Sequence, residues 1–341
     1  MSCAAVAKAL LWTGQVDCYN EQGNKIACEN TGQDAEFQTG LHGPQPRFLK
    51  KGDQVEDCLT GLYWTRKSNF AEFPLNWQES LDFIRQMNQQ TYLGFNDWRL
   101  PNRRELYSLL SFQHSRPALP EGHPFDEVFP GWYWTSTSAA ISPDHAWYIH
   151  MDGARMFYGG KDQSYLVWPV RGSDTGVFIA TGQQRCYDHK GQEIECLATG
   201  QDGEYRVGRQ WPENRFCLQG DIVEDRLTGL QWLRQASLGQ QPVNWQQALA
   251  QVAEFNQQSA QHWRLPSINE LESLVDCSRA RPALAAAELF SQLKDVYWSS
   301  STSLYEPDWA WALYMNKGAV GVGQKYLPAF HVWPVSGIIS A

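Results

Sequence analysis

The chain contains, at residues 98–106, the stretch Trp-Arg-Leu-Pro-Asn-Arg-Arg-Glu-Leu, and at residues 263–271 the related stretch Trp-Arg-Leu-Pro-Ser-Ile-Asn-Glu-Leu. In both, a polar residue after the proline is followed three positions later by glutamate, which is the sequence pattern of a capping box. Each stretch therefore predicts the start of a helix. The arginine lies between two apolar residues in both copies, so we expect internal ion pairs of Arg99 with Glu105 and of Arg264 with Glu270.

The tryptophans repeat along the whole chain with almost the same offset. Twelve of the sixteen form six pairs: Trp64 and Trp232, Trp77 and Trp245, Trp98 and Trp263, Trp134 and Trp298, Trp147 and Trp311, and Trp168 and Trp333. A period of about 165 residues is the size of a domain, so we predict one domain written twice and not a solenoid. The first copy spans residues 1–172 and the second residues 173–341. Because both copies keep them, the paired tryptophans are expected to be buried scaffold.

Other segments indicate the fold class. Trp77 and Trp245 each follow an asparagine, a good N-cap, and begin stretches with apolar residues at helical spacing. Most of the remaining chain alternates short runs of Trp, Tyr and Val with Gly, Asn and Asp, as in short strands joined by turns. Each copy is therefore predicted to be α+β, with two helices followed by a strand-rich end.

The composition is that of a compact, aromatic-rich and acidic protein. Aromatic residues make up 13% of the chain, the mean hydropathy is −0.49 and the formal net charge is −9. These values fit turn-rich domains with aromatic cores and do not fit a disordered chain. No apolar run approaches the ~18 residues of a membrane span, and the negative charge disfavours a nonspecific grip on nucleic acid. We therefore expect no transmembrane segment and no nucleic-acid partner.

Four of the eight cysteines occur as two pairs in equivalent positions. Cys18 and Cys28 flank a turn-like tetrapeptide, and so do Cys186 and Cys196. We expect each pair to close a small hairpin as a disulfide. Zinc is the weaker alternative, because no second close pair of Cys or His supplies the other two ligands. Disulfides imply an oxidising compartment, so the predicted location is extracellular or the cell surface, with the periplasm as an alternative.

The other four cysteines do not recur between the copies: Cys3, Cys58, Cys217 and Cys277. A bridge between the two copies through Cys58 or Cys217 is therefore left open. No intact signal peptide is visible, because residues 4–12 are too short an apolar stretch and lack a basic flank. Whether Cys3 carries a lipid is also left open.

A series of motifs occurs in the same order in both copies. It runs Asp-x-x-Thr-Gly-Leu-x-Trp, Trp-x-x-Ala/Ser-Leu, Trp-Arg-Leu-Pro-Asn/Ser-x-x-Glu-Leu, Tyr-Trp-Ser/Thr-Ser and a closing Val-Trp-Pro-Val. Over residues 45–172 and 213–337 this order resembles the Lcl C-terminal domain family of bacterial secreted and surface proteins, which includes collagen-like adhesins. The resemblance implies two tandem C-type-lectin-like domains of the formylglycine-generating-enzyme type, each with two helices and a twisted, mostly antiparallel sheet, preceded here by a disulfide hairpin. It also implies adhesion or carbohydrate binding.

No catalytic constellation is recognisable. Formylglycine-generating enzymes use paired cysteines in the C-terminal part of their domain, and no cysteine follows Trp134 in copy one or Cys277 in copy two. The chain has no Gly-x-Ser-x-Gly elbow, His-Glu-x-x-His pair or phosphate loop. We therefore expect a protein that is not an enzyme and binds no metal or cofactor. Calcium is a weaker alternative at four aspartates that fit hairpin turns better: Asp53, Asp57, Asp221 and Asp225.

The copies differ most towards their ends, and we place the candidate ligand-binding residues there. Residues 147–168 and 311–333 mix aromatic and polar side chains, which suit sugar or protein recognition on a rigid frame. The candidates are Tyr148, His150, Asp152, Arg155, Tyr158, Lys161, Trp309, Tyr314, Asn316, Lys317 and Lys325. The unpaired Trp132 and Trp211 join Trp309, because the shared scaffold does not require them. Drifted surface loops are the simpler alternative.

These residues predict a site of a particular shape. A glycan site is expected as a concavity near the end of a domain, lined by Tyr148, Arg155 and Tyr158 or by Trp309, Tyr314 and Lys317. The leading function is a secreted or surface-exposed bacterial binding module, a glycan-binding adhesin whose partner is a glycan or a surface protein. A self-associating structural subunit of an extracellular assembly or filament is the alternative from another class, and an unrecognised enzyme is a third.

Overall fold

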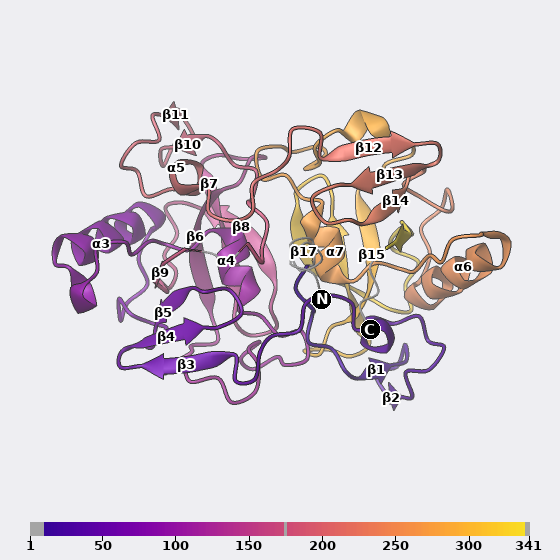
Figure 1. Ribbon diagram of the computed structural model, residues 1–341, viewed down its shortest axis with the longest axis horizontal. Coiled ribbons are helices and arrows are strands. Elements are labelled where there is room, and N and C mark those ends of the chain that lie inside the picture. The colour runs from indigo at the N-terminus through magenta and orange to yellow at the C-terminus, as the bar shows by residue number, and fades with distance from the viewer. Residues whose placement is uncertain (1–9, 174–175, 338–341) are drawn as a thin grey trace.

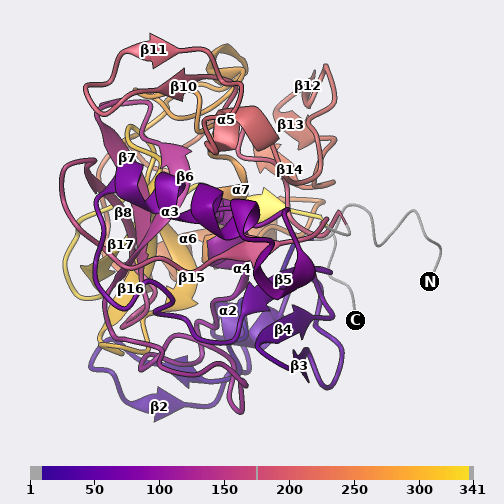
Figure 2. The same cartoon turned by 90° about the vertical axis from the view of Figure 1, so that its left-hand side faces the viewer.

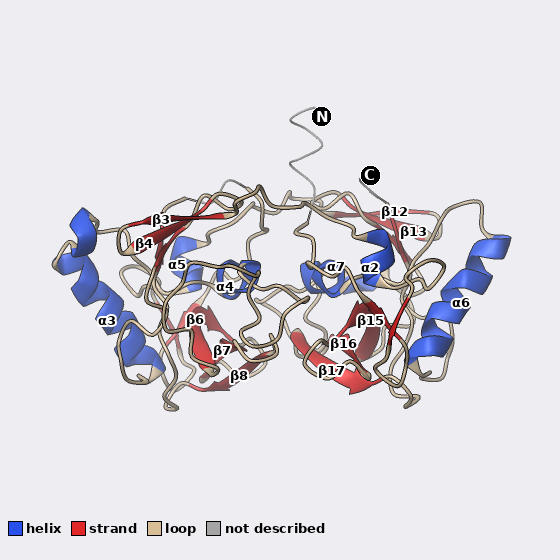
Figure 3. Cartoon of the chain, turned by 90° about the horizontal axis from the view of Figure 1, so that it is seen from below, coloured by secondary structure: helices blue, strands red, loops and turns tan. Residues whose placement is uncertain are grey.

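The computed structural model describes residues 10–173 and 176–337. Two halves with the same order of elements lie side by side, with one long helix at each end of the molecule (Figures 1 and 3). Helices combine with antiparallel sheets in both halves, so the α+β prediction is confirmed. The C-type-lectin-like assignment stays a prediction. Within the described residues, no helix combines the length and apolar character needed to cross a membrane.

The main helices begin where the sequence predicts. The long helices α3 (Trp77–Gln89) and α6 (Trp245–Gln258) and the short helices α4 (Arg103–Ser108) and α7 (Ile268–Ser273) all open with complete capping boxes. The predicted ion pairs are confirmed as well, with Arg99 Nε 3.1 Å from Glu105 Oε1 and Arg264 Nη1 2.5 Å from Glu270 Oε2. The other helical segments are single turns: α2 (Asp34–Phe37), α5 (Asp202–Tyr205), η1 (Tyr92–Gly94) and η2 (Ala287–Leu289).

Each half has its own four-stranded antiparallel sheet. In copy one the order is β3-β4-β5-β9, with β3 (Phe48–Lys51), β4 (Gln54–Asp57), β5 (Tyr63–Thr65) and β9 (Val170–Arg171). In copy two the order is β12-β13-β14-β18, with β12 (Phe216–Gln219), β13 (Ile222–Asp225), β14 (Gln231–Leu233) and β18 (Val335–Ser336). The last strand of each copy thus pairs with a strand from early in the same copy, and this pairing closes the unit.

A six-stranded antiparallel sheet joins the two halves. Its order is β15-β16-β17-β8-β7-β6, built from β6 (Trp132–Ser138), β7 (His145–His150), β8 (Met156–Gly160), β15 (Val296–Thr302), β16 (Trp309–Tyr314) and β17 (Ala319–Gln324). The join is the pairing of β8 with β17 at Met156 and Val320. Each copy therefore covers the edge strand of the other, which removes two exposed strand edges.

The disulfide hairpins are exchanged between the halves. The first hairpin pairs β1 (Cys18–Tyr19) with β2 (Lys25–Ile26) and lies on copy two; the second pairs β10 (Cys186–Tyr187) with β11 (Glu193–Ile194) and lies on copy one. Figures 1 and 2 show them on opposite sides of the molecule. The division at residues 172 and 173 describes the repeat in sequence, whereas the packing crosses it.

The exchange rests on equivalent contacts in both directions. Ser301 donates to Asp34 over 2.5 Å, and Thr137, the equivalent of Ser301, donates to Asp202 over 2.7 Å. The amides that follow in the strands donate to glutamine side chains, from Thr302 to Gln15 over 3.1 Å and from Ser138 to Gln183 over 2.8 Å. The same arrangement is thus built twice.

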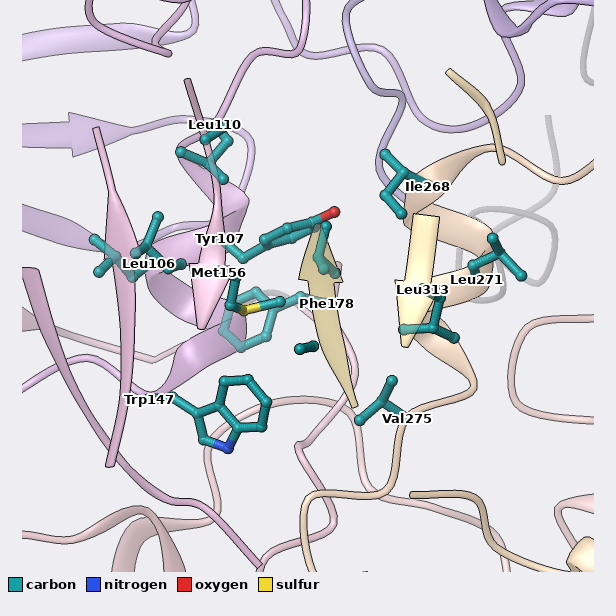
Figure 4. Packing of buried hydrophobic residues seen from close by; sticks show 14 of the residues in the cluster. Leu106, Tyr107, Leu110, Trp147, Met156, Phe178, Ile268, Leu271, Val275 and Leu313 are labelled. Carbon is teal, nitrogen blue, oxygen red and sulfur yellow. The ribbon is translucent and has the colours of Figure 1, made fainter. Parts of the chain in front are cut away.

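One hydrophobic core continues through both halves. All six tryptophan pairs are at most 3% exposed, so their predicted burial is confirmed. Figure 4 shows side chains of both copies meeting at the join, among them Trp147 and Met156 of copy one and Phe178, Ile268 and Leu313 of copy two.

A buried charge cluster also ties the halves together. Arg103 and Arg104 of α4 approach Glu272 of α7 at 3.2 and 3.1 Å, and all three side chains are at most 6% exposed. The Arg103 guanidinium also lies 4.2 Å from the ring centroid of Trp147. Arg104 donates to the carbonyl oxygens of Ala180 and Val275. For Arg104, whose guanidinium nitrogens all donate, these contacts compensate for taking the charge out of water. Arg103 donates only through Nη2, to Glu272 and to the carbonyl oxygen of Gly318.

Both predicted disulfides are confirmed, Cys18 with Cys28 and Cys186 with Cys196. The bridge between the copies that the sequence left open is absent, because Cys58 and Cys217 both carry free thiols. Cys277 is free and buried, and Cys3 lies outside the described residues.

Candidate functional site

Aromatic side chains gather on one face of the six-stranded sheet in copy one. Tyr148 and His150 alternate along β7 and therefore point to the same face, and Trp132 of β6 stands opposite His150. The Trp132 ring lies 4.3 Å from Tyr148 and 4.4 Å from His150, in edge-to-face contacts. Phe157 of β8 pairs with Tyr148, and Tyr165 lies 4.8 Å from it. We call these five residues the aromatic row.

The row runs from the core out to solvent. Its inner end packs under α3, where Tyr148 joins Trp134, Trp77 and Leu81. Tyr148 is only 9% exposed, and this burial raises the pKa of its hydroxyl. Trp132, His150 and Tyr165 are half-buried, and Phe157 is 36% exposed. Rings fixed on a rigid sheet with accessible outer faces lose little entropy when they bind a ligand.

Polar groups border the row. His150 Nδ1 lies 2.5 Å from the carbonyl oxygen of Asp152, so this nitrogen donates and the neutral ring keeps Nε2 as an acceptor. Lys317 of copy two places its ammonium 5.5 Å from the ring centroid of Phe157. The predicted residues Tyr148, His150 and Lys317 are thus brought to one face.

Copy two does not repeat the row. At the positions of Trp132, Tyr148 and Phe157 it has Val296, Ala312 and Gly321. Tyr314, the equivalent of His150, instead covers Gly321: a Cβ added there would come within 2.8 Å of its ring. The aromatic row is therefore a feature of copy one alone.

The structure separates the other residues of the predicted concavities. Tyr158 pairs with Trp147 across the strands and packs 5.2 Å from it, and its ring also stacks on that of Phe157 at 5.0 Å, at the edge of the aromatic row. Arg155 lies at the join, 3.2 Å from Glu306 of copy two. Asp152 pairs with Arg116 at 3.2 Å.

In copy two, Trp309 and Tyr314 lie at opposite ends of β16, five residues apart, so they point to opposite faces. The backbone amide of Asn316 donates to Asp295. Trp309, Tyr314 and Lys317 therefore do not line one concavity.

Lys161 and Lys325 require a correction, because they are buried and unavailable to a ligand. Their side chains are 2% and 0% exposed. Lys161 donates to the carbonyls of Tyr187 and Asp188, and Lys325 to those of Tyr19 and Asn20, so each lysine holds an exchanged hairpin. Burial lowers both lysine pKa values to about 7. The signal was in the sequence, since both copies keep this lysine as they keep the scaffold tryptophans.

The metal alternatives gain no support. The cysteines of the zinc alternative form disulfides. Asp57 and Asp225, two of the residues weighed for calcium, are buried and paired with Arg47 and Arg215 at 2.8 and 2.7 Å. Over residues 10–173 and 176–337, no three His, Cys, Asp or Glu side chains gather as a metal-binding group.

The family model of the Lcl C-terminal domain matches residues 53–171 and again residues 221–336. The chain belongs to this family. Each match begins near the turn before β4 or β13 and ends at the last strand of its copy, so the exchanged hairpins lie outside both. No curated protein and no solved structure matches the chain. Membership of the Lcl C-terminal domain family, together with the two disulfides, indicates an extracellular domain.

Proposed function

We propose that this protein is an extracellular binding module whose aromatic row binds a glycan, as an adhesin does. The observation that carries the proposal is the cluster of Trp132, His150 and Phe157, partly exposed on a rigid sheet face. Aromatic rings stack on the apolar faces of sugar rings, and His150 Nε2 and the Lys317 ammonium supply polar partners for hydroxyls.

The charge of the chain narrows the class of glycan. The formal net charge is −9, which opposes the approach of a polyanion. We therefore propose a neutral glycan, bound by stacking and hydrogen bonds. We also propose that the protein binds the glycan without changing it chemically, because the row offers rings, an imidazole and an ammonium but no nucleophile beside a base.

A glycan array run at two salt concentrations tests this function, with light scattering on the same sample. We expect neutral-glycan hits whose strength barely changes with salt, because stacking is not screened. A hit should also be recovered chemically unchanged after incubation. No hit at either salt concentration, together with polymerisation that grows with protein concentration, would support the structural-subunit alternative instead.

A further inference from the structure

A cavity of about 420 Å³ lies beside the join of the two halves. Its wall comes from residues 10–14, the loop at 41–48, helix α4 and residues 177–179, and α7 of copy two closes one side. The volume is within the range of small-molecule sites. No residue of the aromatic row lines the cavity, so it is separate from the proposed glycan surface.

The duplication shows what fills the equivalent space in copy two. Gly40 and Gly208 occupy the same position in the two copies and share a φ of +117°, so the chain turns in the same way at both. Three residues later copy one has Gly43, which lines the cavity, whereas copy two has Trp211. Copy one therefore lacks the indole that copy two holds at this point.

The contacts of Trp211 define the chemistry of that space. Its ring lies 4.3 Å from the guanidinium of Arg215, and its Nε1 donates to the carbonyl oxygen of Ala180 over 2.8 Å. A Cβ on Gly182 would come within 3.2 Å of the ring. The equivalents of Arg215 and Gly182 in copy one are Arg47 and Gly14, and both line the cavity. The cation and the close glycine that receive an indole are thus present without a side chain at position 43. Trp12, whose ring stacks on His42 at 4.1 Å, forms another part of the cavity wall.

Polar atoms in the wall point to the same kind of ligand. Tyr107 Oη, Asn269 Oδ1 and Trp12 Nε1 are buried and have no hydrogen-bond partner among the described residues, and all three residues line the cavity. Figure 4 shows the Tyr107 hydroxyl directed away from α4 towards copy two. Buried polar groups left without partners are costly, so a ligand that pairs with them gains affinity.

We infer that this cavity is a binding site for a planar aromatic molecule of indole or phenol size that carries a polar atom. The ring stacks on Arg47 as Trp211 stacks on Arg215, and the polar atom pairs with Tyr107 or Asn269. The inference does not depend on glycan binding, because the two sites share no residue.

Two reciprocal variants test the site, with indole as the probe and cyclohexanol as the non-aromatic comparison. In Gly43→Trp the protein supplies its own ring, and the atoms nearest to a Cβ at this position belong to Arg47 and Leu59, at an ordinary 3.5 Å. Trp211→Gly opens the equivalent space in copy two. Titration followed by ligand-observed NMR should give one indole site in the unaltered protein, at least tenfold weaker binding in Gly43→Trp, and a second site in Trp211→Gly.

The melting temperature separates filling from misfolding. Gly43→Trp should melt no lower than the unaltered protein, and indole should raise the melting temperature of Trp211→Gly more than that of Gly43→Trp. Cyclohexanol should bind weakly to all three proteins. Indole binding that Gly43→Trp leaves unchanged, or no indole binding to the unaltered protein, would overturn the inference. Neither result bears on the glycan array.

Discussion

The paired tryptophans occupy equivalent buried positions in both halves. Trp77 and Trp245 each donate to a carbonyl of the central sheet, at Thr135 and Ser299, over 2.8 and 2.7 Å. Trp168 donates in the same way to Thr65 over 3.0 Å. Each of these three indoles fills core volume and satisfies its one polar atom. The buried indole nitrogens of Trp64, Trp147, Trp232 and Trp311 have no hydrogen-bond partner among the described residues, so what all six pairs share is the core volume that they fill.

Replacing a paired tryptophan should therefore be costly. We expect Trp168→Ala to lower the free energy of unfolding by about 3–5 kcal/mol, because a fully buried ring leaves a cavity. Trp132→Ala, which removes a half-buried ring of the same size, should cost clearly less. Urea unfolding of both variants measures the difference. Equal losses would mean that burial does not distinguish paired from unpaired tryptophans.

The charges at the join could not be predicted in the same way. The motif at 98–106 predicted the ion pair of Arg99 with Glu105, since both residues lie within one short stretch and Arg99 stands between two apolar residues. It gave no partner for Arg103 or Arg104, because Glu272 lies in the other copy and its equivalent in copy one is Tyr107. Long-range pairs between diverged positions leave no local pattern.

Removing the charge of Glu272 tests the importance of this cluster. Glu272→Gln leaves Arg103 and Arg104 buried without their anion, and we expect a loss of about 3–5 kcal/mol in the free energy of unfolding. The matched control is Glu306→Gln, which breaks the exposed pair with Arg155 and should cost less than about 1 kcal/mol. Chemical denaturation compares the two. A loss in Glu272→Gln as small as in the control would show that the carbonyl contacts alone hold the arginines.

At the scale of elements, the sequence predicted each disulfide hairpin but not its place. Cysteine spacing and turn residues are local, so the pairing could be predicted from them. The surface on which a hairpin packs is set by contacts such as Asp34 with Ser301, 267 positions apart in the chain. The exchange becomes visible only in the structure.

The short helices α2 and α5, which follow the exchanged hairpins, should make stability depend on pH, because each begins with a buried aspartate. Burial raises the pKa values of Asp34 and Asp202 from 3.8 to about 6, against the lowering effect of their hydroxyl donors. Between these values the folded state binds more protons than the unfolded state, so stability falls as pH rises from about 4 to 6. At one pKa unit per 1.36 kcal/mol, the loss is at most about 3 kcal/mol for each carboxyl.

The double variant Asp34→Asn, Asp202→Asn isolates this effect. The free energy of unfolding of both proteins is measured by denaturation at pH 4.5 and 6.5. Between these two pH values the unaltered protein should lose stability relative to the double variant. The same change in stability with pH for the two proteins would contradict the assignment of the pH dependence to Asp34 and Asp202.

For the whole molecule, duplication produced one joined body with different surfaces on its two halves. The repeat, the fold class and the family follow from motifs that both copies keep. The join of β8 to β17 does not follow from these motifs, because it pairs segments whose sequences have diverged. The sequence also placed Tyr148, His150 and Lys317 among the ligand candidates. In the structure Tyr158 packs between Trp147 and Phe157, Trp309 lies at the other end of β16 from Tyr314, and Lys161 and Lys325 are buried.

The most direct test of the central claim compares equivalent positions in the two copies. Trp132 belongs to the aromatic row, and Val296 holds the same sheet position in copy two. A glycan found on the array is titrated against Trp132→Ala and Val296→Ala, with unfolding curves confirming that both are folded. We predict at least a tenfold weaker affinity for Trp132→Ala, corresponding to about 1.4 kcal/mol, and an unchanged affinity for Val296→Ala. Full affinity in Trp132→Ala would contradict the assignment of the glycan site to the aromatic row.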